Sequence, residues 1–147
     1  MGRGWNEEAI EGYLSSLAPF EAYWRVSPEA LAAVERATSD PSPNTWAATS
    51  DTLLRISAEI DAVRRRLAAL TPPPEAAHLA ALVEKGLRLE SSAYYLLANY
   101  YAGRGDLFRE DGLDDLETAE GYLHTVTIEI ELLRKIQRAR KRSRGPA

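Results

Sequence analysis

Apolar side chains recur every three or four residues along most of the chain, the spacing that gathers them on one face of an α-helix. The cleanest run alternates steps of three and four without a miss: Trp46, Thr49, Leu53, Ile56, Ile60, Val63, Leu67 and Leu70. Sustained alternation with a period of two, which indicates β-strands, does not occur in the sequence. The pattern therefore predicts an all-α protein.

Proline and glycine divide the sequence into four long helical segments. They cover roughly residues 6–38, 44–70, 74–102 and 111–136, separated by SDPSP, TPPPE and a loop that is rich in glycine and aspartate. Short connections between long helices favour neighbours that run antiparallel. We therefore expect an antiparallel up-down four-helix bundle, with residues 1–147 forming a single domain.

The first of these segments is the least regular. Asn6 is placed to cap its start, and Pro19 falls inside its apolar stripe, where a proline kinks or interrupts a helix. Ser27 and Pro28 have the pattern of a new helix start, because serine is a favoured cap and proline is favoured at the first helical position. We expect the first helix to be kinked or split near Pro19 and Pro28.

Composition limits the chemistry that the chain can support. Apolar residues make up 45% and cysteine is absent, which is typical of a soluble domain and excludes disulfides, thiolate metal sites and cysteine nucleophiles. No apolar run approaches the roughly 20 residues of a membrane span. The opening residues, MGRGWNEEAI, lack the apolar stretch of a signal peptide. As written, the sequence favours the cytoplasm, or an extracytoplasmic location if an export signal has been removed.

The net charge of −4 is distributed unevenly. Residues 134–144 hold seven basic side chains and no acidic one, so the remaining chain balances 22 acids against 11 of the 18 bases. We expect residues 137–147 to form a frayed basic tail with four candidate anion-binding side chains: Arg138, Arg140, Lys141 and Arg142. An anionic membrane surface or a nucleic acid is an alternative partner for this tail. Nucleic acid is disfavoured because no aromatic side chain is interleaved with the basic ones.

Two features suggest a small-molecule site. Aromatic side chains should gather at the end of the bundle where the second helix starts and the third helix ends. Glu90 interrupts an apolar row of the third helix, so it needs a partner if it is buried, and folding the last two helices together places His124 opposite it. The candidate ligand-binding residues are Trp46, Tyr94, Tyr101, Tyr122, Glu90 and His124.

No metal or cofactor is expected, and no catalytic residue is assigned. Glu75 and His78 have the Glu-x-x-His spacing of di-iron bundles, but His124 follows Glu120 by four residues and there is no third histidine. The leading hypothesis is a non-enzymatic binding or assembly module that acts on a protein partner or on itself. The alternatives are small-molecule binding or weak acid–base catalysis at the tyrosine-rich end, and an anionic membrane or nucleic-acid contact through the tail.

The junction between the second and third helices has a recognisable order. A helix ends in Leu67-Ala-Ala-Leu70, a turn of Pro72-Pro73-Pro74-Glu75 follows, and His78 opens the next long helix. This junction resembles one in uncharacterised bacterial extracytoplasmic helical proteins, many of them lipoproteins. The resemblance covers about residues 44–136 and implies an exported four-helix bundle without an assigned activity.

Overall fold

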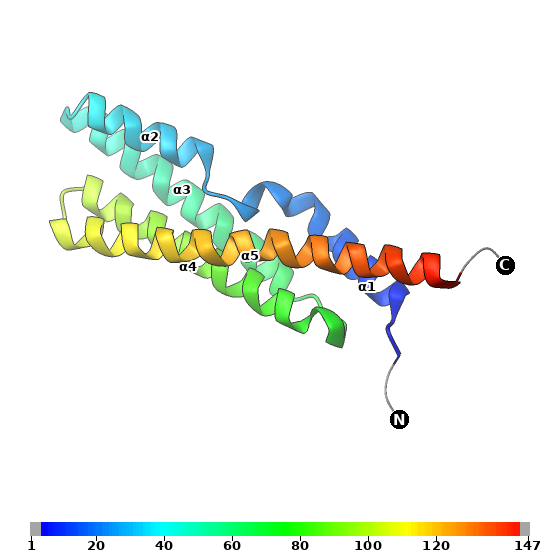
Figure 1. Cartoon of the computed structure of the whole chain (residues 1–147). Helices are drawn as coiled ribbons and strands as arrows, with labels where there is room; N and C mark the ends of the chain where they lie inside the picture. Colours follow the sequence, from blue (N-terminus) through cyan, green and yellow to red (C-terminus); the bar gives the residue numbers. More distant parts are fainter. Residues whose placement is uncertain (1–3, 145–147) are drawn as a thin grey trace.

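The structure of the protein, a computed structural model, describes residues 4–144, and these residues form helices joined by short turns (Figure 1). In chain order the elements are α1 (Glu7–Leu17), the 3₁₀ helix η1 (Ala18–Trp24), α2 (Pro28–Ser39), α3 (Pro43–Ala68), the short 3₁₀ helix η2 (Pro74–Ala76), α4 (Ala77–Tyr101) and α5 (Asp106–Arg144). No strand occurs in this part of the chain. The helices pack against one another as four rods, which confirms the predicted all-α four-helix bundle.

The first rod of the bundle is split, as the two prolines predict. α1 gives way to η1, whose first turn holds Pro19. The backbone is then extended at Arg25, and α2 begins at Pro28. The Ser27 hydroxyl caps α2 by accepting a hydrogen bond from the backbone N–H of Ala30. This rod therefore consists of three pieces in sequence, α1, η1 and α2.

Small side chains bring α2 close to α3. The inner face of α2 presents Ala30, Ala33 and Ala37, all of which are buried. The hydroxyl of Thr49 and the indole N–H of Trp46, both on α3, donate hydrogen bonds of 3.2 Å to the backbone oxygens of Ala33 and Ala37. α2 is thus held on α3, whereas η1 contacts α5. The first rod therefore changes neighbours along its length.

The core lies where α3, α4 and α5 meet. Its fully buried side chains include Leu53 and Ile60 of α3, Leu87 of α4, and Leu123 and Val126 of α5. α5 is one uninterrupted helix of 39 residues. Its buried positions from Ala119 to Gln137 follow one another by steps of three and four. Such spacing commits one face of a helix to the bundle and leaves the opposite face to solvent.

α5 begins at Asp106, so the predicted start near Gly112 was wrong. The preceding turn uses Gly103 and Gly105, whose φ angles of 81° and 132° favour glycine. Gly112 lies inside α5, where an added Cβ would come within 2.9 Å of the Leu97 Cγ atom on α4. A glycine that lets two helices approach closely has the same sequence signature as a helix boundary.

Candidate functional site

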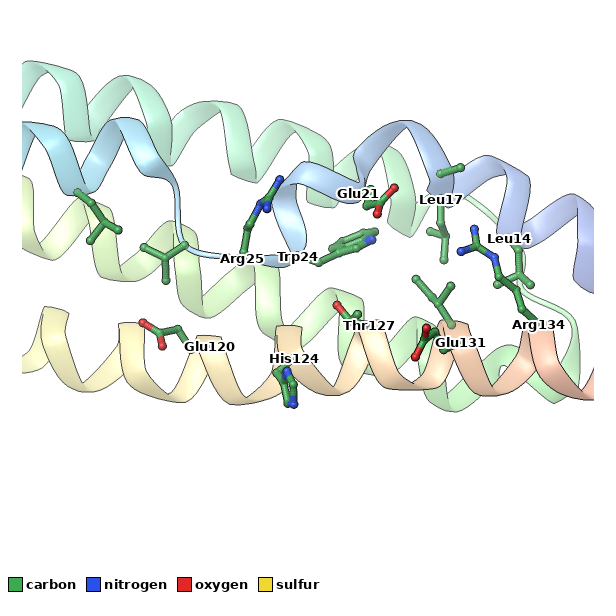
Figure 2. Close-up of a pocket in the computed structure, with 14 residues that line it drawn as sticks. Leu14, Leu17, Glu21, Trp24, Arg25, Glu120, His124, Thr127, Glu131 and Arg134 are labelled. Atoms are coloured by element: carbon green, nitrogen blue, oxygen red, sulfur yellow. The ribbon is translucent and has the colours of Figure 1, made fainter.

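A cleft of about 720 Å³ lies between α1 and η1 on one side and α5 on the other (Figure 2). Its floor is apolar and includes Leu14 and Leu17 of α1, Trp24 of η1 and Ile130 of α5. All four side chains are buried members of the hydrophobic core, so the cleft opens directly onto that core. Its volume falls within the range of roughly 300–1,000 Å³ that is typical of pockets for small organic molecules.

The cleft exists because the first rod is interrupted. A continuous helix would cover α5 with a regular stripe of side chains, but η1 winds more tightly than an α-helix and the backbone at Arg25 is extended. Beyond this point α2 moves onto α3. The space left beside α5 is bordered by Val26 and by Leu31, whose side chain is partly exposed (48%). The interruption predicted from Pro19 and Pro28 thus produces the cleft.

Titratable side chains surround the opening of the cleft. They are Glu21, Arg25, Glu120, His124, Glu131 and Arg134. Within residues 4–144, none of these six forms an ion pair or a side-chain hydrogen bond. Figure 2 shows that the carboxylate of Glu120 lies on the side of α5 that faces the cleft, whereas the His124 side chain points away from η1. The arrangement offers charges of both signs above an apolar floor.

Glu90 lies in the core and is only 1% exposed. The Tyr94 hydroxyl donates a hydrogen bond of 3.2 Å to Glu90 Oε1 and accepts one of 2.9 Å from the backbone N–H of Ser27. Glu90 Oε2 has no hydrogen-bond partner among the described residues. Burial raises the pKa of Glu90 to about 8, against a smaller lowering by the Tyr94 hydroxyl. Glu90 is therefore largely a neutral carboxylic acid near neutral pH, and it links α4 to the start of α2 through Tyr94.

The sequence predicts that Glu90 and His124 face each other. In the structure, the two side chains lie in different surroundings. Glu90 is enclosed in the core, whereas His124 is exposed at the opening of the cleft. No hydrogen bond joins them in the part of the chain that the structure describes. The observed partner, Tyr94, follows Glu90 by four residues on the same face of α4, a spacing that was readable in the sequence.

The four candidate aromatic residues divide into separate places. Trp46 and Tyr101 come together with Tyr100, with ring centroids 5.0 to 5.2 Å apart, beside a shallow hollow of about 580 Å³. Tyr94 lies in the core, and Tyr122 packs under the Lys85 ammonium at 5.2 Å. The indole N–H of Trp46 is already used to hold α2, so much of this aromatic end serves packing.

The basic end of α5 is helical to Arg144, and its side chains contact α1. Gln137 is 2% exposed, donates to the backbone oxygen of Glu7 at 3.0 Å and accepts a hydrogen bond from the Trp5 indole. Arg144 pairs with the Glu7 carboxylate at 2.7 Å. Residues 145–147 of the expected tail lie outside the described residues.

The four candidate anion-binding residues therefore differ in their surroundings. Arg140 stacks over the Trp5 ring at 5.3 Å, and Lys141 pairs with Glu11 at 3.3 Å. Arg138 and Arg142 are exposed and form no ion pair within residues 4–144. Two of the four side chains are thus engaged with the start of the chain, and two face solvent.

Several residues of the cleft do not stand out in the sequence. Trp24 belongs to the apolar stripe of the first segment, where it reads as ordinary core, and the charges of Glu21 and Arg25 read as solvated surface. The only signal that could have indicated a cleft is the pair of prolines that interrupts the first helix.

Glu75 and His78 lie at the junction of η2 and α4, where His78 is exposed. Within residues 4–144, no three histidine, aspartate or glutamate side chains come together as metal ligands would. No helix in this part of the chain combines the length and the apolar character needed to cross a bilayer. Comparison with protein-family models, with curated proteins and with solved structures finds no match to this chain.

Proposed function

We propose that the protein is a binding module, and that its ligand is a small amphipathic organic molecule held in the cleft between η1 and α5. One observation carries this proposal: the cleft opens onto the hydrophobic core, while the charges around it have no partner within the described residues. An apolar body buried on Leu14, Leu17 and Ile130 would gain roughly 25 cal/mol for each Å² removed from water. Polar groups of the ligand would meet the arginines and glutamates around the opening.

Trp24 supports this assignment by its position. Its side chain lies in the floor of the cleft and is 7% exposed, so a ligand that enters the cleft would contact a large, rigid aromatic surface. Aromatic side chains contribute much contact area at small cost in conformational entropy. A ligand in this position would also change the fluorescence of the indole.

The other two regions considered as binding sites have weaker support. At the aromatic end, the rings of Trp46, Tyr100 and Tyr101 pack on one another and the Trp46 N–H is satisfied. At the basic end of α5, Arg140 and Lys141 are occupied by Trp5 and by an acidic side chain of α1. Of these three regions, the cleft is the one in which buried apolar side chains lie beside several unpaired charges.

A titration with anilinonaphthalene sulfonate, an amphipathic fluorescent probe, tests the proposal. The wild-type protein should bind one probe molecule per chain at saturation, and Trp24 fluorescence should fall in the variant Trp5→Phe/Trp46→Phe, in which Trp24 is the remaining indole. Thr127→Phe places a ring in the cleft from an exposed position of α5 and should weaken probe binding at least about tenfold.

Thr38→Phe provides the matched control, because Thr38 is an exposed threonine on α2 that does not line the cleft. It should bind the probe as the wild type does. Equal probe binding by Thr127→Phe and the wild type, with both variants retaining the helical circular dichroism spectrum, would place the site elsewhere and refute the proposal.

A further inference from the structure

We infer that the outward face of α5 is a self-complementary surface that pairs antiparallel with the same face of a second copy of this chain. This inference concerns the face of α5 next to the cleft. His124 and Glu131 border both regions, but the inference does not depend on the ligand of the cleft. It rests on the order of charges along α5, on the exposed Ile128 near the centre of the face, and on the exposed Gly121.

The outward face is defined by ten residues of α5 that follow one another in alternating steps of four and three, and we call them the outer row. They are Glu110, Asp114, Glu117, Gly121, His124, Ile128, Glu131, Lys135, Arg138 and Arg142. Every member of the row is exposed. Figure 1 shows α5 as one continuous rod along the bundle, so the row is not interrupted by a bend. At 1.5 Å per residue, the row extends over roughly 48 Å.

The two ends of the outer row carry opposite charges. Its first part carries Glu110, Asp114 and Glu117, and its last part carries Lys135, Arg138 and Arg142. One further acid of the row, Glu131, lies between its centre and the basic part. None of the six side chains at the two ends forms an ion pair within residues 4–144. The basic residues of α5 that turn towards α1, in contrast, do pair, as Lys141 and Arg144 show.

The acidic and basic residues are placed symmetrically about the level of Val126, a core residue on the opposite face of α5 that lies midway between Glu110 and Arg142 in the sequence. Glu117 and Lys135 each lie nine positions from it, Asp114 and Arg138 each lie twelve, and Glu110 and Arg142 each lie sixteen. In an antiparallel pair of α5 helices with its two-fold axis at the level of Val126, each of these acids therefore faces a base of the second copy. The two-fold axis repeats the three contacts, which gives six attractive pairs and no repulsive one among these residues.

The centre of the outer row consists of Gly121, His124, Ile128 and Glu131, and in the antiparallel pair Glu131 would face Gly121 of the second copy and meet no charge of the row. Ile128, 50% exposed, would face His124 of the second copy near the two-fold axis, and the half-exposed Leu132 flanks it. Gly121 lies next to the acidic part. An added Cβ at Gly121 would meet nothing within 4 Å, whereas one at Gly86 or Gly112 would collide with a neighbouring helix. Gly121 thus costs helix stability without a packing reason inside one chain, and it permits close approach by a second helix.

Charge order also selects this partner over an anionic membrane. A membrane surface would attract the basic part of the outer row, but the acidic part of the same straight helix would be repelled. A second copy in antiparallel orientation satisfies both parts at once. Because the pairs are exposed to solvent, we expect association that weakens as salt is added.

Sedimentation velocity over a range of protein concentrations tests the inference. Wild-type protein should show a monomer–dimer equilibrium at about 0.05 M salt, and the dimer should be lost at about 0.5 M salt. Two double variants should each weaken association at least about tenfold: Asp114→Lys/Glu117→Lys, the acid swap, and Lys135→Glu/Arg138→Glu, the base swap. In a homodimer of either double variant, each of the two substituted positions faces a charge of the same sign. The two-fold axis repeats these contacts, so four pairs become repulsive.

Mixing the two double variants gives the decisive measurement. The lysines introduced in the acid swap face the glutamates introduced in the base swap, and the remaining native charges also face opposite charges. The mixture should therefore form a heterodimer as tightly as the wild type forms its dimer. Arg36→Glu/Arg65→Glu, which alters the net charge as the base swap does but on α2 and α3, should leave the wild-type dimer intact.

Three outcomes would overturn the inference. The first is a wild-type protein that stays monomeric at low salt, and the second is a mixture of swapped variants that does not associate. The third is a wild-type monomer that sediments with phosphatidylserine vesicles or with duplex DNA and loses this property only in the base swap, since that result would assign the basic part to an anionic partner. Circular dichroism of each variant shows that loss of association does not arise from unfolding.

Discussion

The α3–α4 side of the bundle and the outward side of α5 differ in how their charged side chains are partnered. On the first side, Arg64 bridges Asp61 at 2.9 Å and Glu84 at 3.2 Å, and Arg88 also reaches Glu84. The Arg64 guanidinium lowers the pKa of the Asp61 carboxyl by hydrogen bonding to it. On the second side, the charges of the outer row have no partner within residues 4–144.

This difference separates stability from recognition. Exposed ion pairs contribute only about 0–1 kcal/mol each, so the paired charges of α3 and α4 stabilise the fold modestly, and the unpaired charges of α5 cost it little. The stability of the bundle comes from apolar side chains buried in the core, including those on the inner face of α5. Its outer face is therefore available for binding, and changes on the two faces should have very different effects.

Among the variants compared here, Glu90→Gln should change the free energy of unfolding most, because it replaces a titratable group that is enclosed in the core. Its pKa is about 8 in the folded protein and near the ordinary value of 4.5 in the unfolded chain. Between these values the folded state keeps a proton that the unfolded state has lost, so stability falls by about 1.4 kcal/mol for each pH unit of increase. The total loss from about pH 5 to about pH 9 should be roughly 3–5 kcal/mol.

Glu90→Gln should remove this loss, because its amide stays neutral. Urea unfolding at several pH values measures the effect. The Asp61 carboxyl, whose pKa is lowered, contributes stability that is lost as the pH falls through its ordinary pKa of 3.8 and below, so it does not interfere in this window. A wild-type protein equally stable at both ends of the range would show that Glu90 is not enclosed as described.

Leu123→Ala against Ile128→Ala compares the two faces of α5 directly. Leu123 is 1% exposed in the core, so its truncation should cost about 3 kcal/mol of unfolding free energy through lost burial and a residual cavity. Ile128 is 50% exposed on the outer row, and its truncation should change the stability of the monomer by less than about 0.5 kcal/mol. Chemical denaturation in about 0.5 M salt, where self-association is suppressed, makes the measurement. Equal costs for the two variants would contradict the assignment of an inner and an outer face.

Gln137→Ala should have a smaller effect than Glu90→Gln or Leu123→Ala, and it sharpens the comparison at the end of α5. It removes the acceptor for the Trp5 indole and the donor to the Glu7 backbone oxygen, which should cost about 1–2 kcal/mol. Arg138→Ala, one residue later and exposed, should lie within about 0.5 kcal/mol of the wild type. Amide hydrogen exchange should show faster opening of α1 in the first variant only; similar exchange in both would mean that Gln137 does not hold α1.

The sequence predicts those features of the fold that depend on local periodicity. The steps of three and four from Trp46 to Leu70 correspond to α3, and Pro19 with Ser27-Pro28 correspond to the divided first rod. Gly112 was misread because a close helix contact and a helix end both favour glycine. The fold class was therefore readable, and the start of α5 was not.

Less of the candidate site than of the fold could be predicted from the sequence. The burial of Glu90 follows from its place in an apolar row, but its partner depends on how far α4 is rotated, and Tyr94 meets it instead of His124. The cleft depends on where the extended residue Arg25 carries the chain from α5 towards α3. Such a crossing has no periodic signature, because it is a property of the packed bundle and not of any one segment.

The contacts that hold α1 on α5 also bear on the order of folding. Trp5 with Gln137, the backbone oxygen of Glu7 with Gln137, Glu11 with Lys141, and the carboxylate of Glu7 with Arg144 join residues 130 to 137 positions apart. Closing so long a loop is entropically costly, and contacts of high sequence separation form slowly. During synthesis, these four contacts can therefore form only after the last turns of α5 have emerged from the ribosome. A nascent chain can hold a folded α3–α4 hairpin well before it can complete the cleft between α1, η1 and α5.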